Sequence, residues 1–145
     1  MVSDLLSRLF GSAPPILPDS DARLALSALL VRVARSDGHY DSAERETIRA
    51  IVTRRYSLDA AAAGTLLAEA ELMESEAPDT VRFTRAIKDA VPYEDRLGVI
   101  ESLWEVVLAD GARDPEEDAL LRMAASLLGV TDQDSNAARL KVTKA

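Results

Sequence analysis

The pattern D-G-x-x-D-x-x-E occurs at residues 37–44 and again at residues 110–117, and it constrains the fold more than any other feature. Apolar residues surround both copies at the same relative positions: Leu30, Val33 and Ile48 around the first, and Leu103, Val106 and Leu121 around the second. A glycine between two stretches of helical apolar spacing is typical of a junction between helices. The pattern therefore predicts a helical hairpin that occurs twice.

The remainder of the chain also has apolar residues at helical spacing and almost no period-two alternation. A length of 145 residues suits one domain with a substantial core. We expect an all-α, single-domain bundle of seven to eight helices, with the two motif hairpins packed about a pseudo-twofold axis. The expected helices of the body cover about residues 20–37, 41–55, 58–77, 79–90, 93–110, 114–128 and 131–140.

Local signals set the expected helix ends. Ser57 and Asp79 are expected to cap the third and fourth helices of the body, and Gly129 to end the sixth. Thr131 is expected to cap the last helix in a weak capping box with Asp134. The apolar stripe of residues 93–110 includes Trp104, which predicts a core position for this side chain.

Residues 1–20 are expected to form an N-terminal arm, with a short helix over residues 3–10 followed by a proline-rich linker. Its apolar residues Leu5, Leu6, Leu9 and Phe10 would lie on one side of that helix. Residues 21–145 are expected to form the helical domain.

The formal net charge of −8 disfavours nucleic acid and anionic membrane surfaces as partners, because binding to both depends on Lys and Arg. The chain has no cysteine and one histidine, which excludes thiolate catalysis and cysteine-based zinc sites. No signal peptide and no membrane-spanning stretch is evident, so we expect a cytoplasmic protein. No catalytic motif is recognisable, and we expect no enzymatic activity.

Helix capping explains much of the repeated motif. Gly38 and Gly111 can adopt the positive φ that ends a helix. The second acids, Asp41 and Asp114, suit N-cap positions, and Glu44 and Glu117 follow three residues later as in a capping box. Pro115 at the first helical position agrees with this register.

Capping does not explain Asp37 and Asp110. Both continue an apolar stripe, and both lie in the last turn of an expected helix, where the dipole disfavours a negative charge by about 0.3–1 kcal/mol. A bound cation would compensate them, and oxygen-only ligands select Ca²⁺ or Mg²⁺. The candidate metal ligands are Asp37, Asp41, Glu44, Asp110, Asp114 and Glu117. Capping alone and cation binding both remain open.

Two further features carry simpler expectations. His39 in the first loop, matched by Ala112 in the second, is expected to be an exposed loop residue. The acidic run at the end of the third helix of the body, which includes Glu69, Glu71 and Glu74, is expected to be a solvated face.

The chain resembles the TerB-like family of bacterial tellurite-resistance proteins over about residues 21–140. The resemblance rests on A-R-S-D-G-H-Y-D-S-A-E-R-E and L-W-E-V-V-L-A-D-G-A-R-D-P-E-E-D-A-L-L, supported by Y-S-L-D, V-R-F-T-R-A-I-K and P-Y-E-D-R-L. It implies an all-α fold with pseudo-twofold symmetry and an acidic surface that binds metal ions, at the same six carboxylates. It also implies partners within a stress-response system that includes membrane proteins. A helical interaction scaffold, in which the acids only cap helices, is the alternative.

Overall fold

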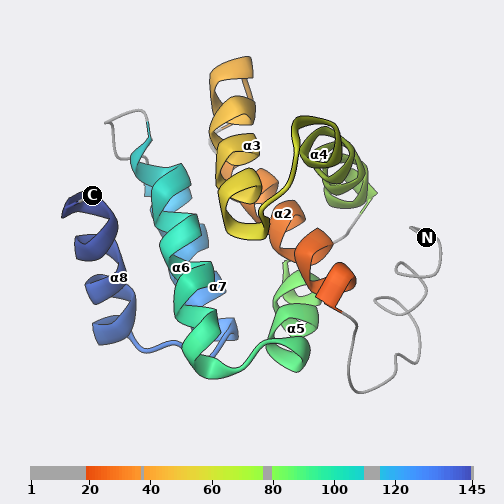
Figure 1. Ribbon diagram of the computed structural model, residues 1–145. Helices are drawn as coiled ribbons and strands as arrows, with labels where there is room; N and C mark the ends of the chain where they lie inside the picture. The colour runs from red at the N-terminus through yellow and green to blue at the C-terminus, as the bar shows by residue number, and fades with distance from the viewer. Residues whose placement is uncertain (1–18, 37, 77–79, 110–114, 145) are drawn as a thin grey trace.

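The structure, a computed structural model, describes residues 19–36, 38–76, 80–109 and 115–144. These residues form seven α-helices and no strand, which confirms the all-α prediction (Figure 1). The helices are α2 (Asp19–Arg35), α3 (Ser42–Tyr56), α4 (Ala60–Glu76), α5 (Val81–Ala90), α6 (Tyr93–Leu108), α7 (Pro115–Leu127) and α8 (Asp132–Lys144).

Helix α2 is the centre of the bundle. It contacts α3, α4, α5, α6 and α7, and every residue from 25 to 34 except Arg32 is buried. A helix that is apolar around most of its circumference is stable only when other helices surround it. The predicted stripe of α2, which includes Leu26, Leu30 and Val33, therefore forms the middle of a single core.

The order of the packing contacts repeats along the chain. Helix α2 packs against α3 and α4, and α6 packs in the same way against α7 and α8. The two motif hairpins, α2–α3 and α6–α7, also contact each other through α2 with α6, α2 with α7 and α3 with α6. The prediction that the hairpins pack together is confirmed, and α5 lies between the two sets in sequence.

Most predicted helix ends lie within two residues of the observed ones, but the role predicted for Ser57 is wrong. Ser57 has φ 53° and ψ 49°, and its N–H bonds to Thr53 O, so it ends α3 in a left-handed conformation. Asp59 begins α4 instead, since its Oδ1 accepts a hydrogen bond of 2.7 Å from Ala62 N. The prediction failed because serine and aspartate are both good caps and stand only two residues apart.

The helix ends in the C-terminal part of the chain agree better with those predicted from the sequence. Gly129 has φ 76° just after α7, as expected of a helix-ending glycine. Thr131 Oγ1 accepts a 3.1 Å hydrogen bond from Asp134 N at the start of α8, although α8 continues to Lys144 and not to residue 140. Helix α5 starts after Thr80, which makes no side-chain cap, and Asp79 lies outside the described residues.

Helix α2 begins at Asp19, close to the predicted boundary of the arm, and residues 1–18 lie outside the described part of the chain. Trp104 is in the core as predicted, with 7% of its surface exposed. Within the described ranges, no helix combines the length and the apolar character that crossing a bilayer requires.

Candidate functional site

The first copy of the motif forms a capped turn between α2 and α3. Gly38 has φ 85°, and its N–H donates to Arg35 O at 2.9 Å, which turns the chain away from α2. Asp41 is the N-cap of α3: its Oδ1 accepts from Glu44 N at 2.9 Å, and Glu44 Oε1 accepts from Asp41 N at 3.3 Å. The predicted capping box is therefore present in the first copy.

The second copy is described only from Pro115 onwards. Pro115 is the first residue of α7, as predicted, and Glu117 at the third position is only 3% exposed. Asp37, Asp110 and Asp114, three of the six candidate ligands, lie outside the described residues, as does Gly111. Within the described ranges, no cluster of three or more His, Asp or Glu side chains suits a metal ion. The predicted metal site stays a prediction.

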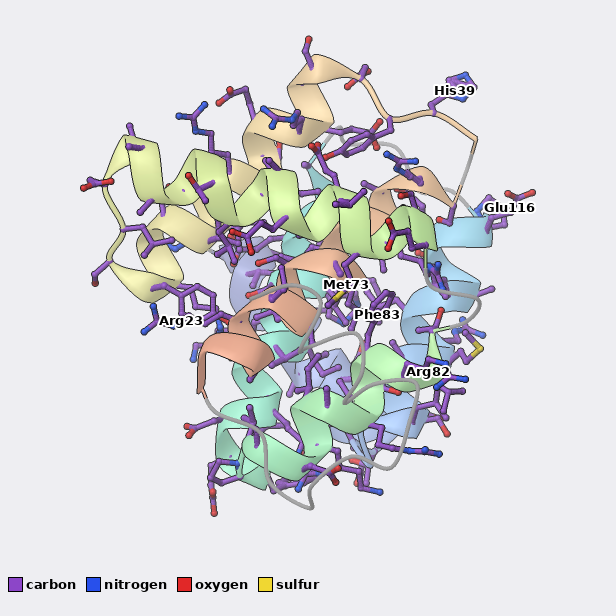
Figure 2. The ribbon with its side chains drawn as sticks, turned by 90° about the vertical axis from the view of Figure 1, so that its right-hand side faces the viewer. Arg23, His39, Met73, Arg82, Phe83 and Glu116 are labelled. Carbon is purple, nitrogen blue, oxygen red and sulfur yellow. The ribbon has the colours of Figure 1, made fainter. Side chains whose placement is uncertain are left out.

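The first motif loop lies beside the end of α6. A pocket of about 270 Å³ is lined by His39, Asp41 and Glu44 of the first loop together with Val106 and Ala109 at the end of α6. Ala109 immediately precedes Asp110, the first acid of the second copy. Figure 2 shows His39, which is exposed as predicted, on the same side of the molecule as Glu116 of α7. The fold therefore brings the first loop against the end of α6, the residues that directly precede the second copy in sequence.

A hydrogen-bonded cluster that the sequence did not predict anchors the first loop to α4. The Tyr40 hydroxyl donates to Glu71 Oε2 at 2.6 Å, and Arg45 Nε donates to the same oxygen at 2.8 Å. The Arg35 guanidinium lies 4.9 Å from the centre of the Tyr40 ring. Tyr40 is the residue between His39 and Asp41, so this cluster fixes the middle of the loop.

The electrostatics of the cluster keep Tyr40 protonated and Glu71 ionised. Burial alone would raise the pKa of Glu71, but the hydrogen bonds from Arg45 and Tyr40 outweigh it and hold the pKa below its usual value. Burial, and then the hydrogen bond to Glu71, raise the pKa of the Tyr40 hydroxyl above its ordinary value. At neutral pH Tyr40 is therefore a donor and Glu71 a charged acceptor.

A second ion cluster lies one turn further along α4. Glu74 is 8% exposed, and its Oε2 accepts a 3.1 Å hydrogen bond from Arg32 Nε. Arg32 Nη2 also donates to the main-chain O of Glu74 at 3.0 Å, and Arg35 Nε lies 3.3 Å from Glu74 Oε1. The end of α4 is thus bound to the end of α2, directly before the first motif loop.

These contacts correct the prediction that the acidic run of α4 is a solvated face. Glu71 and Glu74 point into the bundle, because α4 packs on α2 and α3 with the side that carries them. The signal in the sequence was spacing: Glu74 lies four residues after Ala70 and seven after Leu67, both of which are fully buried. The alanine-rich composition of α4 obscured which of its faces was buried.

The fold defines a class of small helical domain, in which the two hairpins α2–α3 and α6–α7 pack against each other. A family model described as tellurite resistance protein TerB matches residues 23–140. The chain therefore belongs to the TerB family, as its resemblance implied. No curated protein and no solved structure gave a match.

Proposed function

We propose that this protein is a non-enzymatic, cytoplasmic TerB domain whose two acidic loops together bind one divalent cation, Ca²⁺ or Mg²⁺. Within a stress-response system, the same acidic end of the bundle would accept a basic segment of a partner protein. The observation that carries the proposal is the pocket in which Asp41 and Glu44 face Val106 and Ala109.

The pocket supports the proposal because it joins the first loop to the end of α6, which leads directly into the second loop in sequence. Consecutive Cα atoms are about 3.8 Å apart, so Asp110 begins within one residue of the pocket-lining Ala109. Asp37 stands likewise two residues before the pocket-lining His39. Carboxylates held close together repel one another, and a hard cation relieves that repulsion while gaining oxygen ligands.

The capping box refines the roles of the six acids. Asp41 and Glu44 each use one carboxylate oxygen to accept a backbone N–H at the start of α3. They therefore stabilise the helix end whether or not a cation is present. Asp37 and Asp110 are therefore proposed as the principal ligands, and their removal is the informative change.

Calorimetric and NMR titrations with CaCl₂ and MgCl₂ test the proposal on the wild-type chain and on Asp37→Asn and Asp110→Asn. Asp89→Asn is the matched control, because Asp89 is an exposed acid in the last turn of α5 and its loss changes the charge and the helix-dipole interaction alike. We expect wild type and the control to gain about 2.7 kcal/mol of stability at a cation concentration of 100 Kd. The two loop variants should lose that gain.

The absence of heat and of shift changes at the loops up to millimolar cation would remove the proposal. The capping box favours a second candidate, a helical interaction scaffold without a cation. The scaffold predicts that Asp37→Asn keeps or raises the stability by about 0.3–1 kcal/mol, since a charge that opposes the dipole is lost, with no dependence on added metal.

A further inference from the structure

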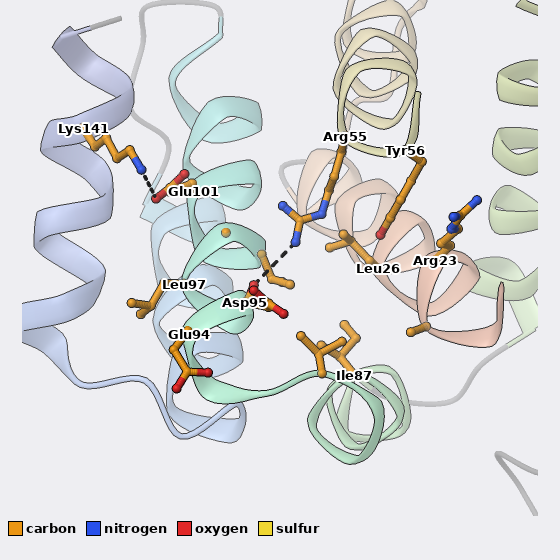
Figure 3. A pocket seen from close by; sticks show the side chains of 14 residues that line it. Arg23, Leu26, Arg55, Tyr56, Ile87, Glu94, Asp95, Leu97, Glu101 and Lys141 are labelled. Carbon is orange, nitrogen blue, oxygen red and sulfur yellow. Dashed lines mark hydrogen bonds and ion pairs between the residues drawn. The ribbon is translucent and has the colours of Figure 1, made fainter. Parts of the chain in front are cut away.

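A second cleft of the described structure lies away from the motif loops. It has a volume of about 580 Å³ and is bordered by α2, α3, α5 and α6, with Lys141 of α8 at its edge (Figure 3). Its lining includes apolar side chains: Leu26 and Ile87 are buried, whereas Val91 and Leu97 are only partly buried. Partly exposed apolar side chains in a concave surface favour an apolar occupant.

The two sides of the cleft carry opposite charges. Arg23 and Arg55 extend from one side, 4.8 and 5.9 Å from the centre of the Tyr56 ring, and neither forms an ion pair within the described residues, although Arg55 Nη2 reaches across to within 3.5 Å of the main-chain O of Asp95. Glu94 and Asp95 lie on the other side (Figure 3). A segment with an apolar face and one charge of each sign therefore complements this cleft.

We propose that the cleft binds the N-terminal segment of this same chain, residues 3–10. Ala22 and Arg23, in the first turns of α2, line the cleft, so the chain enters the domain at the edge of the cleft. Residues 11–18 connect the segment to α2, and at about 3.3 Å per residue these eight residues span up to about 26 Å. The segment is therefore tethered at the edge of the cleft.

The composition of residues 3–10 matches the cleft. The segment contains the apolar residues Leu5, Leu6, Leu9 and Phe10, which match the partly exposed apolar side chains of the lining. Asp4 and Arg8 stand four residues apart and supply one charge of each sign for the two sides. A short tether gives an effective concentration on the order of millimolar, so even a weak contact of this kind is populated within one molecule.

Paramagnetic relaxation NMR on the full chain tests the proposal. The chain has no cysteine, so Ser7→Cys provides a single site for a nitroxide label in the segment. We expect the methyl signals of Val91 and Leu97 to lose most of their intensity, and that of Leu72, an exposed residue on the outer face of α4, to keep it. Introducing Leu6→Ser and Leu9→Ser into the labelled chain should restore the cleft signals, whereas Met123→Ser, at an exposed apolar residue of α7, should not.

A sample that mixes labelled chains with isotope-enriched, unlabelled chains separates binding within one molecule from binding between two. Signal loss that occurs only when the nitroxide and the isotope enrichment are on the same chain supports the proposal. Signal loss in the mixed sample would mean that the segment binds a second copy, and the proposal would be overturned. Unchanged signals at Val91 and Leu97 would overturn it as well.

Discussion

The buried ion cluster of Glu74 makes a quantitative prediction about stability. The Glu74 and Arg32 side chains are 10% and 17% exposed, so Glu74→Leu removes a carboxylate that pairs with a largely buried guanidinium. Removing one partner of a buried pair costs about 3–5 kcal/mol, and we expect about 3 kcal/mol, because Arg35, 42% exposed, can turn to solvent. At about 2–4 °C per kcal/mol, the melting temperature should fall by about 6–12 °C.

A double-mutant cycle with Arg32→Met isolates the charge effect. The double variant should recover most of the lost stability in urea unfolding monitored by circular dichroism, because two apolar side chains replace a buried pair at little or no cost. The control is Glu105→Leu, which breaks a pair with Arg54 that is shorter, at 2.6 Å, but has an arginine that is 64% exposed. Its loss should cost about 1 kcal/mol at most. If Glu74→Leu costs no more than Glu105→Leu, or if the double variant is as unstable as the single one, the reasoning is refuted.

Two further predictions concern Glu71 and Gly98. Because the folded pKa of Glu71 is lowered, its contribution is complete above the unfolded pKa of about 4.3 and is lost as the pH falls through the folded pKa. Between pH 7 and pH 3, thermal unfolding should therefore show a larger loss of stability for wild type than for Glu71→Gln, and parallel profiles would contradict this. A Cβ on Gly98 would stand 2.9 Å from Arg55 Nη1, so Gly98→Ala should change the free energy of unfolding little in wild type. In an Arg55→Ala background, the same change should stabilise by about 1 kcal/mol, and equal effects in both backgrounds would show that Arg55 does not oppose it.

The all-helical fold and the core of α2 and α6 could be predicted because their apolar residues recur with a clear helical period. Leu26, Leu30 and Trp104 were assigned to the core on that basis and are buried. The capping box of Asp41 and Glu44 was predictable for a different reason: it is a local interaction between residues three apart, so it needs no tertiary information.

The contacts of Tyr40 and Glu71 could not be predicted, because they depend on how α4 is rotated against α2 and α3. Helix α4 begins with four alanines, which pack almost equally well on any side, so the periodicity left that rotation undetermined. The sequence of such a helix does not show that its carboxylates are paired, because the arginine that binds Glu71 is Arg45, which belongs to a different helix.

The position of Trp104 gives the protein an internal optical probe. It is the chain's single tryptophan, it is buried on α6, and its indole Nε1 donates to Ser135 Oγ of α8 at 3.2 Å. The indole hydrogen bond breaks when α8 separates from α6, whereas the ion clusters of Glu71 and Glu74 join α4 to α3 and α2. Fluorescence from Trp104 therefore reports on the surroundings of α6 and α8, and circular dichroism reports on every helix. A comparison of the two signals resolves whether the duplicated halves unfold together or one after the other.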